Sequence, residues 1–161
     1  MYPVKDRDTL EISWIMEDLN PFYKSNPAKY VSNLMGHEGK NSLLSFLIDE
    51  GLALSLSAGH MNEKGMFSRF LVSITLTEKG LENYEEVCRI VFQYVKMLKE
   101  TGVQERVFTE LKDILKFKFD FKDKENPMTY TTHLSNFMQY YPYEDVVRLP
   151  FLLEEYKPDL F

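Results

Sequence analysis

The stretch "LALSLSAGHMNEKGMFSRFLVSITL", residues 52–76, decides the fold. Its first part, Leu52–His60, alternates apolar and small polar residues, and its last part, Met66–Leu76, is rich in aliphatic and aromatic residues. Both patterns predict strands, and the polar turn at 60–65 predicts an antiparallel pair. Two strands alone cannot bury an apolar face, so the flanking segments must supply the cover.

The segments before this pair predict one further strand and two short helices. Residues 9–16, "TLEISWIM", alternate and then become fully apolar, as expected for a strand that enters a core. Residues 27–35 begin with a proline and predict a helix that stops at Gly36. Residues 42–50 carry a wide apolar stripe and predict a second helix, ended by Gly51.

The segments after the pair predict helices. A long helix runs from a Thr77 cap to Gly102, and another begins near Gln104. Residues 127–141 predict a third helix, and the tail predicts two short helices interrupted by Pro150. This order of elements is typical of an α+β domain, with helices packed on an antiparallel or mixed sheet.

Length and composition restrict the class of protein. A chain of 161 residues, 44% of them hydrophobic and 14% aromatic, predicts a single folded domain over residues 1–161. The net charge of −6 argues against a nucleic-acid partner, which usually requires a basic face. The longest partly apolar run, "GLALSLSAGHMN", is too short and polar to cross a membrane. A single cysteine, Cys88, excludes an internal disulfide framework and a cysteine-rich zinc site.

The adjacent pair His37-Glu38 suggests a metal site, but the spacing does not fit one. The motif H-E-x-x-H needs a second histidine where Asn41 stands, and the inverted motif H-x-x-E-H is absent. A site assembled in three dimensions from His37, His60 and a carboxylate stays open. We therefore expect no catalytic and no metal-binding residues in this chain.

Other catalytic and binding motifs are also missing. The sequence has no G-x-S-x-G elbow and no glycine-rich phosphate loop. The run "KFKFDFKDKE", residues 116–125, could stack on single-stranded nucleic acid. We favour a helix that continues through this run, with its Phe side chains in the core and its charges in water, because no turn residue precedes it.

The turn "GHEGKNS", residues 36–42, leads to a hypothesis about binding. Gly36 and Gly39 permit backbone torsions closed to other residues, and Asn41 or Ser42 can cap the helix that follows. Glu38 offers an anion at which the amino terminus of a peptide could dock. The alternative is a helix-capping turn with a surface histidine.

Eight segments of the chain, taken in order, resemble one family. They are "YPVKD", "FYKSNP", "GHEGKNSLLSFL", "ITLTEKG", "VFQYVKMLKETGVQERVF", "FKFDFKDKENP", "YYPYEDV" and "LLEEYKPDL". Through these segments the chain resembles the insulinase (M16) family of zinc metalloproteases, the insulin-degrading enzymes, over nearly its whole length.

The resemblance implies a place in a longer enzyme. Family members consist of four related α+β domains of the LuxS/metallohydrolase-like type, and this chain resembles the second, non-catalytic domain of the N-terminal half. The zinc and its H-x-x-E-H motif belong to the preceding domain. The resemblance thus implies that the parent protein is a zinc metalloendopeptidase that degrades short peptides. It also implies that this chain, taken alone, is inactive and holds no cofactor.

The resemblance also implies a substrate-binding site. In the family the second domain carries an exosite that pairs the amino terminus of the substrate with a strand edge, and Gly36 and Glu38 match positions of that site. Leu56, Ala58 and His60 match it on the strand. Ala58 and His60 stand where the family often has Gly and Gln. We expect the methyl group of Ala58 to leave less room for the substrate backbone. We expect the titratable His60 to make anchoring of the substrate depend on pH.

The expected partners are peptide substrates and the remaining domains of the parent protease, which could be a homo-oligomer. We expect a cytoplasmic protein without nucleic-acid or membrane partners. The competing hypothesis is a stand-alone interaction module that binds peptides by strand addition.

Overall fold

The computed structural model describes residues 8–63 and 65–160. Two parts of the predictions lie outside these ranges: the segment "YPVKD", residues 2–6, of the family resemblance, and Lys64 of the predicted turn. The elements are β1 Thr9–Met16, η1 Asn20–Phe22, α1 Pro27–Met35, α2 Leu43–Asp49, β2 Ala53–Asn62, β3 Ser68–Leu76, α3 Glu78–Glu82, α4 Tyr84–Thr101, α5 Glu105–Asp120, α6 Pro127–Phe137, α7 Tyr143–Val146, η2 Leu149–Phe151 and η3 Pro158–Leu160. The α+β class predicted from the sequence is confirmed.

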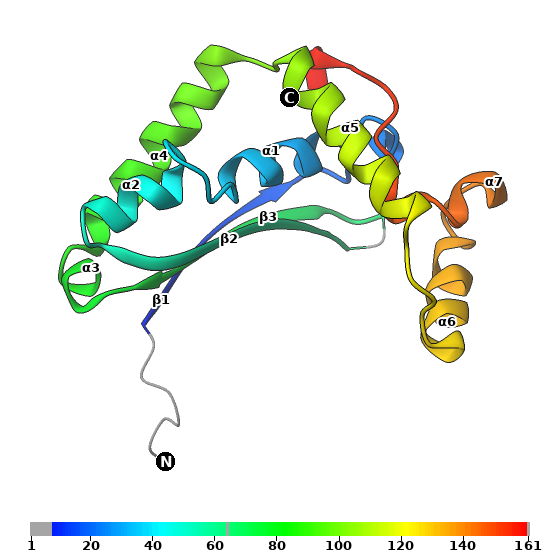
Figure 1. Cartoon of the computed structure of the whole chain (residues 1–161), viewed down its shortest axis with the longest axis horizontal. Coiled ribbons are helices and arrows are strands. Elements are labelled where there is room, and N and C mark those ends of the chain that lie inside the picture. Colours follow the sequence, from blue (N-terminus) through cyan, green and yellow to red (C-terminus); the bar gives the residue numbers. More distant parts are fainter. Residues whose placement is uncertain (1–7, 64, 161) are drawn as a thin grey trace. The chain divides into compact units, whose positions relative to one another are not determined.

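The described residues form two compact units. Unit 1 contains residues 8–21 and 27–102, and unit 2 contains residues 22–26 and 103–160. All three strands belong to unit 1, in the order β1-β3-β2 with antiparallel neighbours (Figure 1). That residues 1–161 act as a single domain stays a prediction.

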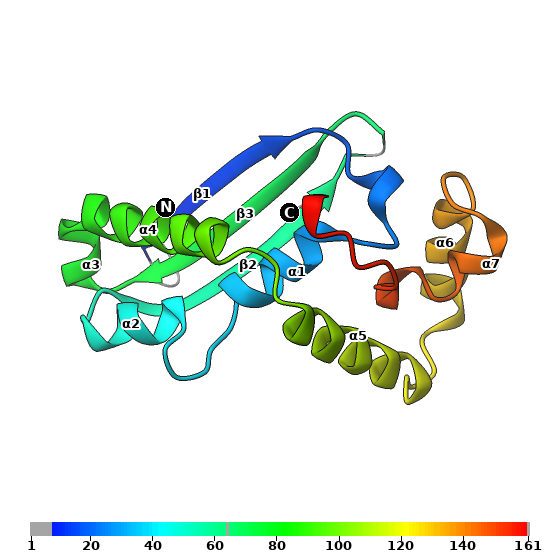
Figure 2. The same ribbon diagram turned by 90° about the horizontal axis from the view of Figure 1, so that it is seen from above.

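The sheet of unit 1 carries its helices on one face. Helices α1, α2 and α4 all lie on that side, with α1 and α2 along β2 (Figure 2). Alternate residues of β3 point to this face, and Val72 and Ile74 are fully buried there beside Leu47 of α2. The period of two in the sequence thus becomes one apolar face under the helices.

The helix ends in unit 1 follow the local signals of the sequence. The Ser42 hydroxyl accepts a hydrogen bond from the Ser45 amide at 3.0 Å, and the Thr77 hydroxyl accepts one from the Gly80 amide at 2.9 Å. Gly51 and Gly102 end α2 and α4 with φ of 70° and 67°. These values lie in the left-handed region that glycine adopts without steric cost.

The long helix predicted over 77–102 is wrong in one respect, because it breaks at Asn83. There φ is −118° and ψ is 35°, so α3 ends and α4 begins. A methyl group at Gly80 would lie 1.9 Å from the Leu52 carbonyl oxygen, so α3 lies against the backbone that enters β2. This close approach fixes the direction of α3, and α4 needs a new start to cross the sheet.

In unit 2 the helix α5 continues to Asp120, so the run "KFKFDFK" is helical up to that residue as predicted. Its Phe side chains do not all enter a core, however: Phe117 is 62% exposed and Phe121 is 72% exposed. Their rings contact one another, with centroids 4.5 Å apart, while Phe119 packs on Phe151. The prediction of three buried rings is wrong because a helix turns 100° per residue and cannot direct alternate residues to one side.

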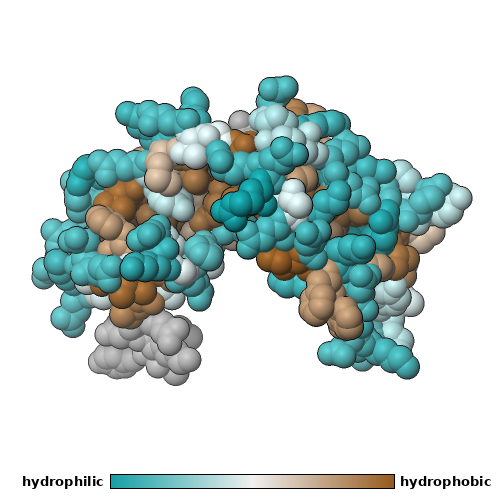
Figure 3. Space-filling model, turned by 45° about the horizontal axis from the view of Figure 1, so that its top comes forward, coloured by the Kyte–Doolittle hydropathy of each residue, from teal (hydrophilic) through white to brown (hydrophobic). Residues whose placement is uncertain are grey.

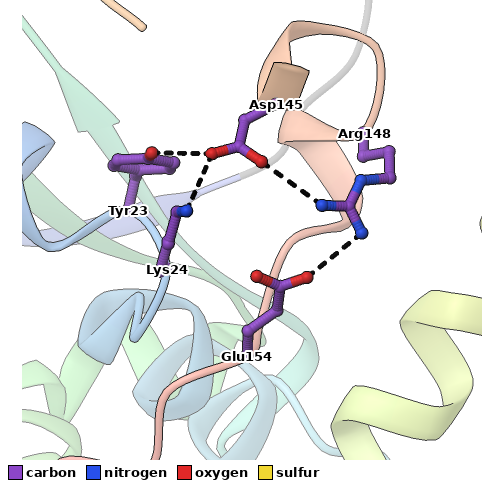
Figure 4. Close-up of polar contacts among 5 residues, drawn as sticks. All are labelled: Tyr23, Lys24, Asp145, Arg148 and Glu154. Carbon is purple, nitrogen blue, oxygen red and sulfur yellow. Dashed lines mark hydrogen bonds and ion pairs between the residues drawn. The ribbon is translucent and has the colours of Figure 1, made fainter. Parts of the chain in front are cut away.

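A polar network ties residues 22–26 into unit 2 (Figure 4). The Asp145 carboxylate, 5% exposed, accepts a hydrogen bond from the Tyr23 hydroxyl at 2.8 Å and pairs with Lys24 at 3.0 Å and Arg148 at 3.3 Å. Arg148 also pairs with Glu154 at 3.1 Å, and the Glu154 amide donates to the Lys24 carbonyl at 2.7 Å. These contacts, those of Lys24 and Tyr23 foremost, hold the pKa of Asp145 below its ordinary value.

Candidate peptide-binding site

The turn after α1 is held by hydrogen bonds to the last residues of that helix. The Gly36 amide donates to the Ser32 carbonyl at 2.9 Å, and the His37 amide donates to the Leu34 carbonyl at 3.4 Å. The Tyr94 hydroxyl of α4 donates to the same Leu34 carbonyl at 3.3 Å. The start of the turn is therefore fixed from two sides.

Gly36 lies directly against β2. A methyl group placed on Gly36 would lie 3.7 Å from the Ala58 amide nitrogen, 3.9 Å from the Ala58 Cβ and only 3.0 Å from the Ser32 carbonyl oxygen. The distances to Ala58 are ordinary van der Waals contacts, whereas the distance to the Ser32 carbonyl oxygen is tight, so a side chain here would crowd the end of α1. Two of the predicted site residues, far apart in the sequence, are thus in contact.

The torsional explanation for the two glycines of the turn is wrong. Neither Gly36 nor Gly39 has a left-handed φ; the residue that does is Asn41, with φ of 66°. Asparagine tolerates this region better than most residues, and it precedes the Ser42 cap of α2. A side chain at Gly36 would crowd the Ser32 carbonyl at the end of α1, and one at Gly39 would meet the imidazole of His37.

Leu56, Ala58 and His60 share one side of β2. They lie opposite Ile74, Val72 and Phe70 of β3, whose side chains are buried. Leu56 is itself 6% exposed, and its side chain belongs to the apolar cluster under the helices. The Glu63 amide donates to the Phe67 carbonyl at 2.8 Å in the same register, so the odd-numbered residues of β2 bond β3. Because backbone direction alternates along a strand, the backbone groups of Leu56, Ala58 and His60 point away from β3.

β2 is an edge of the sheet among the described residues. The order β1-β3-β2 leaves one side of β2 without a strand partner. An unpaired edge offers backbone donors and acceptors to an extended peptide.

His60 is half-buried near α1. Burial lowers its pKa below the ordinary value of 6.5, and the positive charge of Lys29 on α1 lowers the pKa further. Protonation of the imidazole therefore needs a more acidic solution than for a free histidine.

Glu38 is exposed at the tip of the turn. No hydrogen bond or ion pair joins its carboxylate to another residue of the described ranges. A carboxylate without an internal partner can accept a charge-assisted hydrogen bond from an ammonium group. The turn thus carries an exposed anion, and it meets an edge strand where Gly36 lies against Ala58.

The structure does not bring the histidines and carboxylates together as metal ligands. Within residues 8–63 and 65–160, no group of three His, Cys, Asp or Glu side chains is placed to hold a metal ion. The residues present do not fit a zinc site. The described helices also include none that is both long and apolar enough to span a bilayer.

Two residues near the site were not found by sequence reasoning. The Tyr94 hydroxyl donates a hydrogen bond to the end of α1. The charge of Lys29 acts on His60. Neither has a sequence signal, because both roles depend on which elements lie side by side.

These features define the class of protein. It is an α+β domain in which a glycine-containing turn lies against an antiparallel edge strand, and its described residues assemble no set of metal ligands. The chain belongs to the M16 peptidase family. Residues 2–115 match the family described as "Peptidase M16 inactive domain", and residues 119–161 match "Middle or third domain of peptidase_M16".

Similar proteins support this assignment. The chain is 42% identical to "Insulin-degrading enzyme" of Drosophila melanogaster and of Homo sapiens over 158 residues, which is 98% of this chain but 16% of each relative. It is 37% identical to "Nardilysin" of Homo sapiens over 162 residues, which is 98% of this chain and 14% of that relative. The chain thus spans about a sixth of the relatives it matches.

A solved structure shares the fold. "Crystal Structure of pitrilysin" matches with a TM-score of 0.92 and 24% sequence identity, over 98% of this chain and 17% of that chain. At this identity the likeness shows the fold alone.

Proposed function

We propose that this chain is the substrate-anchoring, non-catalytic part of an insulinase-like zinc metalloendopeptidase that degrades short peptides. The contact of Gly36 with Ala58 carries the proposal, because the turn that bears Glu38 meets β2 there, and the strand order leaves β2 at an edge of the described sheet. The zinc of such an enzyme would be held by another domain. The match to an inactive domain and the names of the relatives support this assignment.

The anchoring mechanism is backbone pairing plus one charge. An extended peptide would add to the free edge of β2 through the backbone groups of Leu56, Ala58 and His60. Its terminal ammonium group would meet the carboxylate of Glu38.

Anchoring would promote cleavage by tethering. A peptide held at one end keeps its remaining length at high local concentration near a distant catalytic centre. This gain needs no contact between this chain and the scissile bond. A cytoplasmic location and an oligomeric parent stay predictions.

The decisive experiment compares two forms of one peptide. We expect Glu38→Gln to weaken binding of a peptide with a free amino terminus about tenfold, the scale of one charge-assisted hydrogen bond, and to leave its acetylated form unchanged. Titration calorimetry measures both affinities.

The matched control for this experiment is Glu11→Gln, which removes an exposed carboxylate from β1 at the opposite edge of the sheet. The control should bind both peptides as the unmodified chain does. An equal loss for both peptides in Glu38→Gln would reject Glu38 as the anchor of the ammonium group.

A further inference from the structure

Helix α6 in unit 2 buries none of its residues. Asn126 caps it by accepting hydrogen bonds from the Met128 amide at 3.0 Å and the Thr129 amide at 3.4 Å, and Pro127 occupies its first turn. These local signals start a helix but do not stabilise one of this length, since short helices depend on packing. α5, in the same unit, has three buried residues.

A hollow of about 310 Å³ lies beside α6. Its lining includes Tyr130, Leu134 and Phe137 of α6, together with Val147 and Phe151. The lining is mostly apolar, and Val147 is 46% exposed. Apolar side chains (brown) interrupt the hydrophilic surface of this unit in Figure 3.

The charged groups at the hollow already have partners. Lys122 pairs with Glu125, and its ammonium group lies 5.3 Å from the centre of the Tyr130 ring and 5.6 Å from that of Phe151. His133 stacks on Phe137, with ring centroids 6.4 Å apart. The hollow therefore lacks a free charge for an anionic ligand, and its chemistry fits apolar side chains.

The family matches indicate what covers this surface. The elements around the hollow belong to residues 119–161, which match the middle or third domain of the family, while the relatives are about six times as long as this chain. We propose that the hollow and the facing side of α6 form the docking surface for apolar side chains from the rest of that middle domain. This inference rests on the proposed place of the chain in a longer protease.

Hydrogen exchange tests the proposal in the 161-residue chain and in the full-length gene product. We expect the α6 amides to exchange freely in the short chain and at least about tenfold more slowly in the full-length protein, the factor expected from burying one aliphatic side chain. Protection of α6 in the short chain equal to that of α5 would overturn the proposal.

A pair of variants locates the surface. Val147→Glu should remove most of the added α6 protection in the full-length protein while leaving the short chain unchanged. The control is Leu81→Glu on α3, because Leu81 is 47% exposed and so matches Val147. It should change the α6 protection in neither the full-length protein nor the short chain. Loss of protection in both variants alike would overturn the assignment to the hollow.

Two further outcomes also decide the question. Concentration-dependent dimerisation of the short chain that Val147→Glu abolishes would make a second copy the occupant, against the proposal. A full-length protein that anchors peptides through Glu38 but leaves α6 unprotected would overturn this inference alone, and the proposed function would stand.

Discussion

Unit 1 buries Leu47, Val72 and Val87 completely, with 0% exposure each, whereas the most buried charged residue among the described part of unit 2 is Asp145, held by three side-chain partners. The apolar cluster under the sheet draws on unit 1 alone among the described residues. Unit 2 instead ties a distant five-residue segment to its helices through a polar network. Apolar burial gains free energy with area, while a polar network mainly avoids the cost of unsatisfied groups.

The largest effect should come from the apolar core of unit 1. Leu47→Ala removes a fully buried side chain, and we expect a loss of about 2–5 kcal/mol in the free energy of unfolding. Trp14, the single tryptophan, lies in β1, and its fluorescence during denaturant unfolding measures the free energy of unfolding of both chains.

The matched control for this prediction is Ile48→Ala, at the next residue of α2, which is 48% exposed and should cost much less. Hydrogen exchange should accelerate more in β2 and β3 than in α5. Equal acceleration in both units would contradict the distinction between them.

A smaller effect should come from the polar network of unit 2. Asp145→Asn keeps the shape of the side chain but removes the charge that faces Lys24 and Arg148, at a cost of about 1–3 kcal/mol. Hydrogen exchange of residues 143–156 measures it. Glu154→Gln, at the exposed end of the network, should cost less than about 1 kcal/mol. A larger cost for Glu154→Gln than for Asp145→Asn would show that burial of Asp145 does not matter.

The smallest effect is a difference in pH dependence between the units. The pKa of His60 in unit 1 lies below its ordinary 6.5, so the unfolded chain binds that proton first and stability falls as the pH drops below 6.5. The pKa of Asp145 lies below its ordinary 3.8, so its contribution is intact above 3.8 and is lost only as the pH falls through the lower folded value.

Two variants separate these windows. His60→Gln should remove the decline of stability just below pH 6.5, and Asp145→Asn should remove the decline below pH 3.8. Unfolding free energies measured across pH 3–7 check both. A His60→Gln profile that still declines just below pH 6.5 would assign that decline to another group.

Local chemistry explains which parts of the fold the sequence predicts. The Ser42 and Thr77 caps and the turns at Gly51 and Gly102 depend on neighbours within a few residues, and each has the predicted role. The break at Asn83 was not predictable, because its cause is the close approach of Gly80 to Leu52, a residue 28 positions earlier.

The candidate site divides in the same way. The sequence and its resemblance gave the turn and the strand, with Gly36, Glu38, Leu56, Ala58 and His60, but not their geometry. Only the fold put Gly36 against Ala58 and buried the side chain of Leu56. Their role in binding stays a prediction.

By itself, then, the sequence determined the period of each strand and helix, most of their ends, and the family of the chain. Only the tertiary structure decided which glycine serves close packing, that Phe117 and Phe121 stay exposed, and that Tyr23 and Lys24 reach Asp145. The physical reason is range: caps and periodicity act between residues a few positions apart, whereas these contacts depend on which elements the folded chain brings together.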